Sequence, residues 1–252
     1  MAITISVAMQ KGGVGKTTTS QTLASILGKK KKRVLLLDMD SQCNSTIISG
    51  IEEPERTITD VLAEECAVNE AIEHCSLYDL LSADELLANL ECIEDIEPTL
   101  LKNTLAAVQT DYDFIIIDTP PALGNLLKIS LMASDYVIIP TEPRPLSIRG
   151  MDALQATIEA VQGSNKALKV LGILLIKYNE RTVLNRQLRE ILDDRAEQMN
   201  TTVFDTFIRE GIAVPEAQTM CMSLIEYAPK SNPCVDYETF VDEVLKTITN
   251  NR

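Results

Sequence analysis

The stretch Gln10-Lys11-Gly12-Gly13-Val14-Gly15-Lys16-Thr17-Thr18 decides how this chain is interpreted. It follows a short β-like run, Ile3 to Met9, and opens a helical run that ends near Leu27. A strand, a glycine-rich loop, a Lys-Thr pair and a helix in this order are typical of a phosphate-binding P-loop. The glycines let backbone N–H groups close around an anion, and the helix N-terminus adds partial positive charge. We therefore expect Lys16 to reach the β/γ-phosphates of a nucleotide and the Thr17 hydroxyl to ligate Mg²⁺.

Two further apolar runs end in carboxylates. Val34–Leu37 leads into Asp38 and Asp40, and Phe114–Ile117 leads into Asp118. Apolar runs without alternation are typical of strands buried on both faces, and parallel α/β sheets bind ligands at the carboxyl ends of their strands. An apolar strand closed by Asp is also the Walker B pattern, in which the Asp holds Mg²⁺ directly or through water. The sequence thus predicts a Mg²⁺ site beside the P-loop.

Strands and helices alternate along the chain, without an internal repeat or a flexible linker. This order predicts an α/β fold: a mostly parallel twisted sheet with helices on both faces, the three-layer α/β/α arrangement of a P-loop NTPase, in a single domain over residues 1–252. Beyond the strands already named, we expect strands at Tyr136–Pro140, Val170–Tyr178 and Val203–Ile208, and helices at Asn125–Ala133, Ser147–Val161, Thr182–Met199 and Asp236–Ile248.

Residues 45–111 are expected to be mostly helical. Capping-box patterns begin at Thr57 and Ser82, and Pro98 suits the start of a helix over Thr99–Gln109. Leu77–Leu81 is the one short run here that favours a strand.

The net charge of −14 is concentrated in one region. Residues 52–97 hold 15 acidic residues against the single base Arg56, and the rest of the chain is neutral. Such a face disfavours nucleic acid and anionic membranes. A solvated surface and a docking surface for a basic partner both fit it.

Cysteine and histidine usage excludes several kinds of site. The six cysteines show no C-x-x-C pair and no zinc spacing, and His74 is the only histidine, which argues against a His-based metal site or catalytic triad. We expect free thiols in a reducing cytosol. The first strand occupies the N-terminus, so we expect no signal peptide, and no apolar run approaches the length of a membrane span.

The P-loop carries a second lysine, Lys11, and in this form it resembles the deviant Walker A motif of the ParA/MinD family of ATPases. The resemblance extends through D-M-D-S-Q-C-N (38–44), I-I-I-D-T-P-P (115–121), I-I-P-T-E-P (138–143) and F-I-R-E-G-I-A-V-P-E-A (207–217). It spans nearly the whole chain. The length and short N-terminus look most like the small ParA-type partition proteins that lack a helix-turn-helix extension.

The resemblance implies ATP and Mg²⁺ as cofactors and assigns roles. Lys11 matches the lysine that reaches phosphate across a nucleotide-sandwich homodimer, where an added cation offsets the charge that develops in phosphoryl transfer. Asp40 matches the residue that orients the attacking water, Asp38 supports Mg²⁺ indirectly, and Asn179 matches a position that contacts adenine. The phosphate-binding set is Lys11, Gly12, Gly13, Val14, Gly15, Lys16, Thr17 and Thr18, of which Lys11 and Lys16 join Asp40 as catalytic residues.

The sequence departs from the family near the base. Relatives often carry P-R-N where this chain has Arg209-Glu210-Gly211, so the base contacts of the 208–215 loop do not transfer directly.

The function implied is that of a DNA partition ATPase. ATP closes two subunits, the dimer binds DNA without sequence preference, and a ParB-like centromere-binding protein stimulates hydrolysis. The protein is then cytoplasmic and nucleoid-associated when ATP-bound. Non-specific DNA binding needs a basic patch, and the candidates are Arg181, Arg186, Arg189 and Arg209. The alternative for these residues is a solvated helix with paired charges.

Other functions share this architecture. A MinD-like membrane-cycling ATPase requires a basic amphipathic C-terminal helix. Val241–Arg252 has few bases, so we expect no membrane binding. A nitrogenase iron protein-like carrier needs cysteines for a cluster, and none follows Asp118 until Cys221. A MinD-like positioning ATPase or a conjugation-related ATPase that does not use DNA as its track stays open as the alternative.

Overall fold

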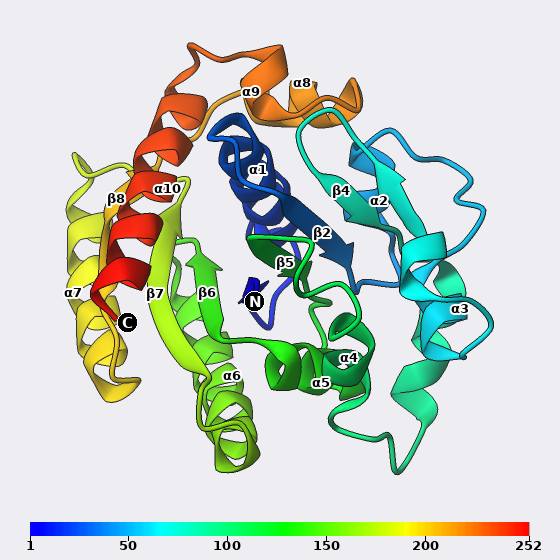
Figure 1. Cartoon of the computed structure of the whole chain (residues 1–252). Coiled ribbons are helices and arrows are strands. Elements are labelled where there is room, and N and C mark those ends of the chain that lie inside the picture. Colours follow the sequence, from blue (N-terminus) through cyan, green and yellow to red (C-terminus); the bar gives the residue numbers. More distant parts are fainter. Residues whose placement is uncertain (252) are drawn as a thin grey trace.

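The computed structural model describes residues 1–251, with the side chains of all but residues 145–149. Eight strands form one sheet in the order β3-β4-β2-β5-β1-β6-β7-β8, and every neighbouring pair is parallel except β3 and β4 (Figure 1). The strands are β1 (Ile3–Val7), β2 (Val34–Asp38), β3 (Ile72–His74), β4 (Asp79–Leu81), β5 (Phe114–Asp118), β6 (Tyr136–Thr141), β7 (Lys169–Ile176) and β8 (Val203–Ile208). The predicted mostly parallel α/β sheet is confirmed.

The central strands are apolar on both faces because helices cover both. Every residue of β2 and of β5 is buried. Leu36 packs into the apolar cluster on one side of the sheet, whereas Leu35 and Leu37 pack into the cluster on the other. This two-sided burial explains why β2 and β5 show no polar alternation.

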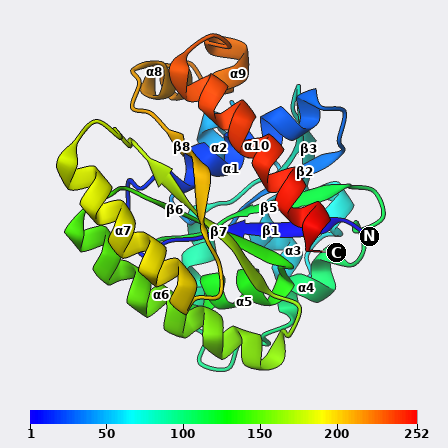
Figure 2. The same cartoon turned by 90° about the vertical axis from the view of Figure 1, so that its left-hand side faces the viewer.

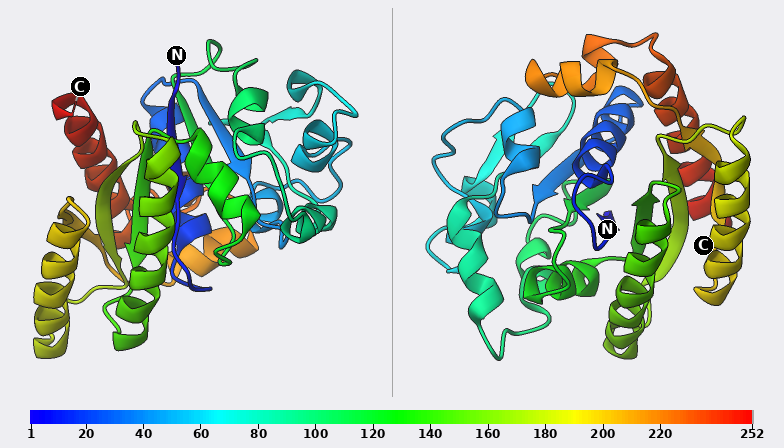
Figure 3. Two further views of the ribbon diagram at one scale, coloured as in Figure 1. Left: turned by 90° about the horizontal axis from the view of Figure 1, so that it is seen from below. Right: turned by 180° about the vertical axis from the view of Figure 1, so that it is seen from behind.

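Two layers of helices enclose the sheet (Figure 2). The helices α1 and α10 contribute to the cluster on one face, whereas α3 to α7 contribute to the clusters on the other. The short helices α8 and α9 lie beside α1 at one end of the molecule (Figure 3). The bounds are α1 (Lys16–Lys29), α2 (Asn44–Ile48), α3 (Ile58–Leu62), α4 (Leu100–Leu105), α5 (Asn125–Ala133), α6 (Pro145–Ser164), α7 (Val183–Gln198), α8 (Ala213–Thr219), α9 (Leu224–Tyr227) and α10 (Asn232–Asn250).

The expectation that residues 45–111 are mostly helical is wrong. Besides α2, α3 and α4, this part contains two 3₁₀ segments, η1 (Val68–Glu70) and η2 (Glu85–Cys92), and the strands β3 and β4. The strand β4 falls inside the expected Leu77–Leu81, but β3 was not expected. Three residues are too few to show a strand period, and β3 is defined by antiparallel pairing with β4.

The helix cap predicted at Thr57 is confirmed, and the one predicted at Ser82 is wrong. The Asp60 carboxylate accepts the Thr57 N–H (2.8 Å) before α3, as the capping-box pattern predicts. The cap expected at Ser82 lies instead at Asp84, whose carboxylate accepts the Leu87 N–H (3.1 Å). Ser82 donates its hydroxyl to Glu73 (2.9 Å), a residue of β3.

Three helix boundaries differ from expectation. The helix α6 begins at Pro145 rather than Ser147, whose side chain lies outside the described set, and α10 begins at Asn232 rather than Asp236. Both helices carry proline in the first turn, where its missing N–H costs nothing. The helix α4 ends at Leu105, four residues before the expected Gln109.

Candidate nucleotide site

The P-loop connects the end of β1 to α1 and requires glycine at two positions. Gly13 and Gly15 both have φ of 75°, a region that side chains disfavour. A Cβ on Gly15 would also lie 2.7 Å from Cδ1 of Ile176, at the end of β7. At Gly12 and Gly13, by contrast, a Cβ would meet nothing within 4 Å, so open space lies beside the backbone of the loop.

Lys16 lies across the loop that it closes. Its side chain is buried, and Nζ donates to the carbonyl oxygen of Lys11 (3.1 Å). Burial lowers the pKa of Lys16, and the charges of Asp118 and Asp40 oppose this shift. Nζ is thus a desolvated cation with few competing partners, which suits it to bind phosphate oxygens.

The strand register places Asp38 and Asp118 side by side. They are paired residues at the carboxyl ends of β2 and β5, and neither has any exposed surface. Burial raises the pKa of Asp38 to about 7, with a further contribution from the charge of Asp118. Burial likewise raises the pKa of Asp118 to about 6. Two carboxyls this close disfavour each other's ionised form unless donors or cations surround them.

Hydroxyl and backbone donors surround both carboxyls. Asp118 accepts from the hydroxyls of Ser45 (2.8 Å), Ser20 (3.2 Å) and Thr17. Asp118 therefore contacts the hydroxyl that is expected to ligate Mg²⁺.

Asp38 is held by the turn that follows it. Its carboxylate accepts from the N–H and the hydroxyl of Thr46 (2.9 Å each) and from the Asp40 N–H (3.1 Å). Asp38 therefore fixes the turn that carries Asp40.

A pocket of about 860 Å³ lies over the P-loop. Asp40, which is only 7 % exposed, lines it beside Gly12, Gly13, Gly15, Lys16, Thr17 and Thr18, and these residues define a phosphate end. On one side the wall continues with Gln42, Asn44, Ile48 and Pro121. On the other it comes from the ends of β7 and β8, the segment after β8, α8 and α10, with Ile176, Lys177, Ile208, Arg209, Glu210, Gly211, Ile212, Val214, Pro215, Gln218 and Tyr237. This second end is the more apolar one, and the pocket as a whole has the volume of a small-molecule site.

The structure shows two contacts to the P-loop helix that sequence patterns did not reveal. Gln218 of α8 donates its amide to the Thr18 hydroxyl (2.9 Å), and the hydroxyls of Tyr237 and Thr19 are 3.0 Å apart. Each contact joins residues at least 200 positions apart in the chain. No local motif marks Gln218 or Tyr237, so only the tertiary fold identifies them.

Not every predicted site residue reaches the pocket. Lys11, Val14, Asp38, Asp118 and Asn179 are not among its lining residues. Val14 is buried in the core, and the Asn179 side chain accepts the Arg181 N–H (3.1 Å). The residues of the β7 end that do line the pocket are Ile176 and Lys177, so an adenine contact of Asn179 stays a prediction.

The four arginines predicted to contact DNA differ in their surroundings. Arg181, two residues before α7, and Arg186, near the start of α7, are exposed. Arg189 is partly buried and donates to the Phe204 carbonyl (3.3 Å). Arg209 lies on the pocket wall, paired with Asp236 of α10. Two of the four are therefore exposed, and the other two are held by groups of the chain itself.

Other kinds of site receive no support from residues 1–251. Within this range there is no group of three or more His, Cys, Asp or Glu side chains placed to hold a metal ion. All six cysteines are free thiols. None of the helices described is both long and apolar enough to cross a bilayer.

Known proteins match this architecture and this sequence. The family model for the AAA domain matches residues 2–170. The chain is 35% identical over 250 residues to the sporulation initiation inhibitor protein Soj of Bacillus subtilis, covering 95% of this chain and 97% of Soj. It is also 32% identical over 257 residues to the chromosome partitioning protein ParA of Myxococcus xanthus, covering 97% of this chain and 88% of ParA.

The chain belongs to the ParA/MinD family of ATPases. A solved structure shows the same fold as this chain. The cobyrinic acid a,c-diamide synthase of Mycobacterium smegmatis, with bound ADP and magnesium, superposes with a TM-score of 0.85 at 30% identity, over 100% of this chain and 97% of the synthase chain.

Proposed function

We propose that this ParA/MinD-type ATPase drives a DNA partition system. ATP with Mg²⁺ closes two subunits into a dimer, the dimer binds DNA without sequence preference, and a ParB-like centromere-binding protein stimulates hydrolysis and release. The chain acts as a single domain over residues 1–252, is cytoplasmic, and associates with the nucleoid while ATP is bound. The relatives Soj and ParA support the partition role.

The pocket fits a magnesium nucleotide. The open backbone of Gly12 and Gly13, the buried Lys16 cation and the N-terminus of α1 supply donors for phosphate oxygens. The Thr17 hydroxyl, backed by Asp118, is the hard oxygen ligand that Mg²⁺ prefers. Bound there, Mg²⁺ would neutralise the charge that develops on the β/γ-phosphates.

Asp40 is the group best placed to orient the attacking water. It lines the phosphate end of the pocket, its Oδ1 accepts the Gln42 N–H (3.0 Å), and Asp38 fixes its backbone. A carboxylate held in this way can accept a proton from a water beside the phosphates.

The observation that carries the proposal is the second P-loop lysine. Lys11 is not among the residues that line its own pocket, although it belongs to the loop that binds phosphate. Its backbone carbonyl oxygen accepts from Lys16 Nζ. A lysine at this position serves a phosphate best when the phosphate is held by a second, facing subunit, which makes hydrolysis depend on dimerisation.

The DNA surface is assigned to Arg181 and Arg186 at the start of α7. Both are exposed, whereas Arg189 and Arg209 are held by other groups of the chain. A dimer presents this pair twice, and phosphate contacts from exposed cations are the main source of non-specific affinity.

The test is DNA binding in each nucleotide state. Fluorescence anisotropy with a labelled random duplex is measured with ADP, ATP and a non-hydrolysable ATP analogue, at low and high salt. We expect binding with ATP and the analogue, little with ADP, and a steep loss of affinity as salt rises. The double variant Arg181→Glu with Arg186→Glu should bind far more weakly, and Lys102→Glu on α4 is the control that should bind normally.

Two results would redirect the proposal. DNA binding in no nucleotide state would favour a positioning or conjugation-related ATPase that does not use DNA as its track. Normal binding by the α7 double variant would remove that surface and leave the nucleotide switch intact.

A further inference from the structure

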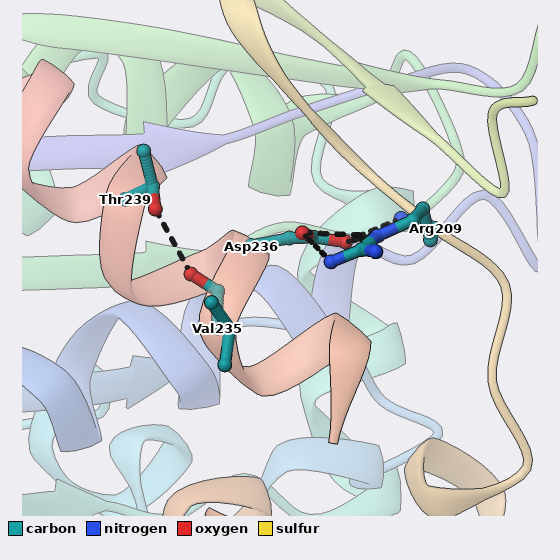
Figure 4. Close-up of polar contacts among 4 residues, drawn as sticks. All are labelled: Arg209, Val235, Asp236 and Thr239. Atoms are coloured by element: carbon teal, nitrogen blue, oxygen red, sulfur yellow. Dashed lines mark hydrogen bonds and ion pairs between the residues drawn. The ribbon is translucent and has the colours of Figure 1, made fainter. Parts of the chain in front are cut away.

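Arg209 follows β8 directly and is fixed by one carboxylate of α10. Asp236 Oδ2 accepts from the Arg209 backbone N–H (3.0 Å) and from Nε (2.9 Å), and Oδ1 accepts from Nη2 (2.6 Å) (Figure 4). The Asp236 side chain is 12% exposed and that of Arg209 43%. A two-pronged pair that also binds the backbone N–H fixes the arginine more firmly than an ordinary surface pair does.

The same turn of α10 reaches the pocket at two further points. Tyr237, next to Asp236, lines the pocket and contacts Thr19 of the P-loop helix. Earlier in the turn, Pro233 lies so close to Gly211 that an added Cβ would come within 2.6 Å of its ring. Within the helix the Thr239 hydroxyl donates to the Val235 carbonyl (3.1 Å; Figure 4). The start of α10 thus fastens the segment after β8 and the P-loop helix to one rigid element.

The pairing also bears on what Arg209 can bind. Asp236 takes up Nε and Nη2 and largely neutralises the guanidinium, which makes Arg209 a poor phosphate ligand for DNA. It leaves the planar faces of the guanidinium, which stack well on aromatic rings. Nearby on the same wall lie the apolar side chains of Ile208 and Ile212, which suit the face of a base.

We propose that Arg209 recognises the nucleoside part of the bound nucleotide by stacking on its base, and that Asp236 is the positioning residue that holds the guanidinium plane at the pocket wall. This inference rests on the proposed ATP binding in the pocket. It replaces the DNA contact expected for Arg209 from the sequence. It predicts that the pair affects ligands that carry a base and leaves bare polyphosphate unaffected.

The experiment compares two ligands by titration calorimetry in the presence of Mg²⁺. ATP carries a base and inorganic tripolyphosphate does not. The variants are Arg209→Ala, Arg209→Lys and Asp236→Ala. The matched control is Asp113→Ala, because Asp113 binds Arg33 in the same way, through the backbone N–H (2.9 Å) and Nη2 (3.2 Å), where β2 and β5 begin and away from their carboxyl ends.

We expect all three pocket variants to bind ATP about tenfold more weakly and tripolyphosphate as the wild type does. Arg209→Lys should lose ATP affinity as well, because lysine keeps the positive charge but lacks the planar face that stacks on the base. The KM for ATP should rise while kcat at saturation stays unchanged. Asp113→Ala should match the wild type with both ligands.

Three results would overturn the inference. They are unchanged ATP affinity in Asp236→Ala, a parallel loss of tripolyphosphate affinity, and full rescue by Arg209→Lys. A wild-type protein that binds neither ligand would contradict the ATPase assignment itself, so the two failures are distinguishable.

Discussion

Asp38 and Asp118 show that a site can depend on residues that do not line it. Both carboxyls are fully buried at neighbouring strand ends, and burial raises the pKa of each. The donors around them belong to the segments that form the pocket: Thr17 for Asp118, and the Asp40 backbone for Asp38. We therefore propose that they position Thr17 and Asp40. The sequence could predict that both lie near the site, but not which groups they contact.

At the residue scale, the backbone of the P-loop could be predicted because a motif fixes it. The glycines, Lys16 and Thr17 of the P-loop lie where the pattern predicts because left-handed turns and a helix start leave few alternatives. The sequence could not show that Asp236 would bind Arg209, since that contact depends on how α10 packs on the end of β8. From its charge alone, Arg209 was expected to contact DNA. In the fold it pairs with Asp236.

His74 offers a pH test because it is the only histidine. A hydrogen bond to Asp79 (2.6 Å), and then the charge of that carboxylate, raise the His74 pKa above 6.5. The pair therefore stabilises the fold fully below pH 6.5, and this contribution is lost as pH rises through the folded-state pKa. A proton NMR titration, with one imidazole signal to follow, should give a pKa above 6.5.

The control for His74 is Asp79→Asn. It removes the charge but keeps an acceptor for the Tyr112 hydroxyl, which donates to Asp79 (2.7 Å). The histidine pKa should then fall towards 6.5. A wild-type value at or below 6.5 would show that the pair does not form in solution.

At the scale of elements, long buried strands and amphipathic helices could be predicted, whereas short elements could not. The strands β2 and β5 are identified by unbroken apolar runs that the two helical layers require. The three-residue strand β3 and the segment η2 carry no such signal, because pairing with β4 and the cap at Asp84 define them. Hence the region 45–111 is where the sequence prediction failed.

Substitution by alanine should have opposite effects on stability at two helical glycines, Gly28 and Gly163. In α1, an added Cβ at Gly28 would collide with the backbone carbonyl of Leu77, whereas at Gly163 of α6 it would meet nothing within 4 Å. Gly28→Ala should therefore lower the free energy of unfolding by about 1–3 kcal/mol. Gly163→Ala should leave it unchanged or raise it by up to about 1 kcal/mol.

Urea unfolding of the two glycine variants and the wild type measures this difference. Both variants change a glycine close to the end of a helix, so helix propensity alone would shift them in the same direction. A Gly28→Ala protein as stable as Gly163→Ala would mean that α1 and the Leu77 segment do not pack as described.

On the scale of the whole molecule, the sheet separates two charged regions. The acidic residues 52–97 include β3 and β4 at one edge of the sheet. The exposed Arg181 and Arg186 precede β8, at the other edge. The region that carries the net charge of −14 therefore lies at the opposite edge of the sheet from the proposed DNA surface. The sequence shows where the acidic residues lie along the chain. Only the strand order shows that they lie at the other edge of the sheet from Arg181 and Arg186.

Under the proposed function, the nucleotide site acts as a switch only if two subunits share it. In the proposed mechanism, one chain supplies the groups that bind phosphate, the carboxylate of Asp40 that orients water, and the wall that contacts the base. The remaining cation, Lys11, belongs to the loop but is not among the lining residues of its own pocket. We therefore expect dimerisation, and not nucleotide binding, to depend on Lys11.

Sedimentation equilibrium with a non-hydrolysable ATP analogue and Mg²⁺ tests this claim most directly. The wild type should have twice the 27.8 kDa mass of the chain, and Lys11→Ala should stay at 27.8 kDa while still binding the analogue. A wild type that stays monomeric with analogue bound, or a Lys11→Ala protein that dimerises as the wild type does, would contradict the account.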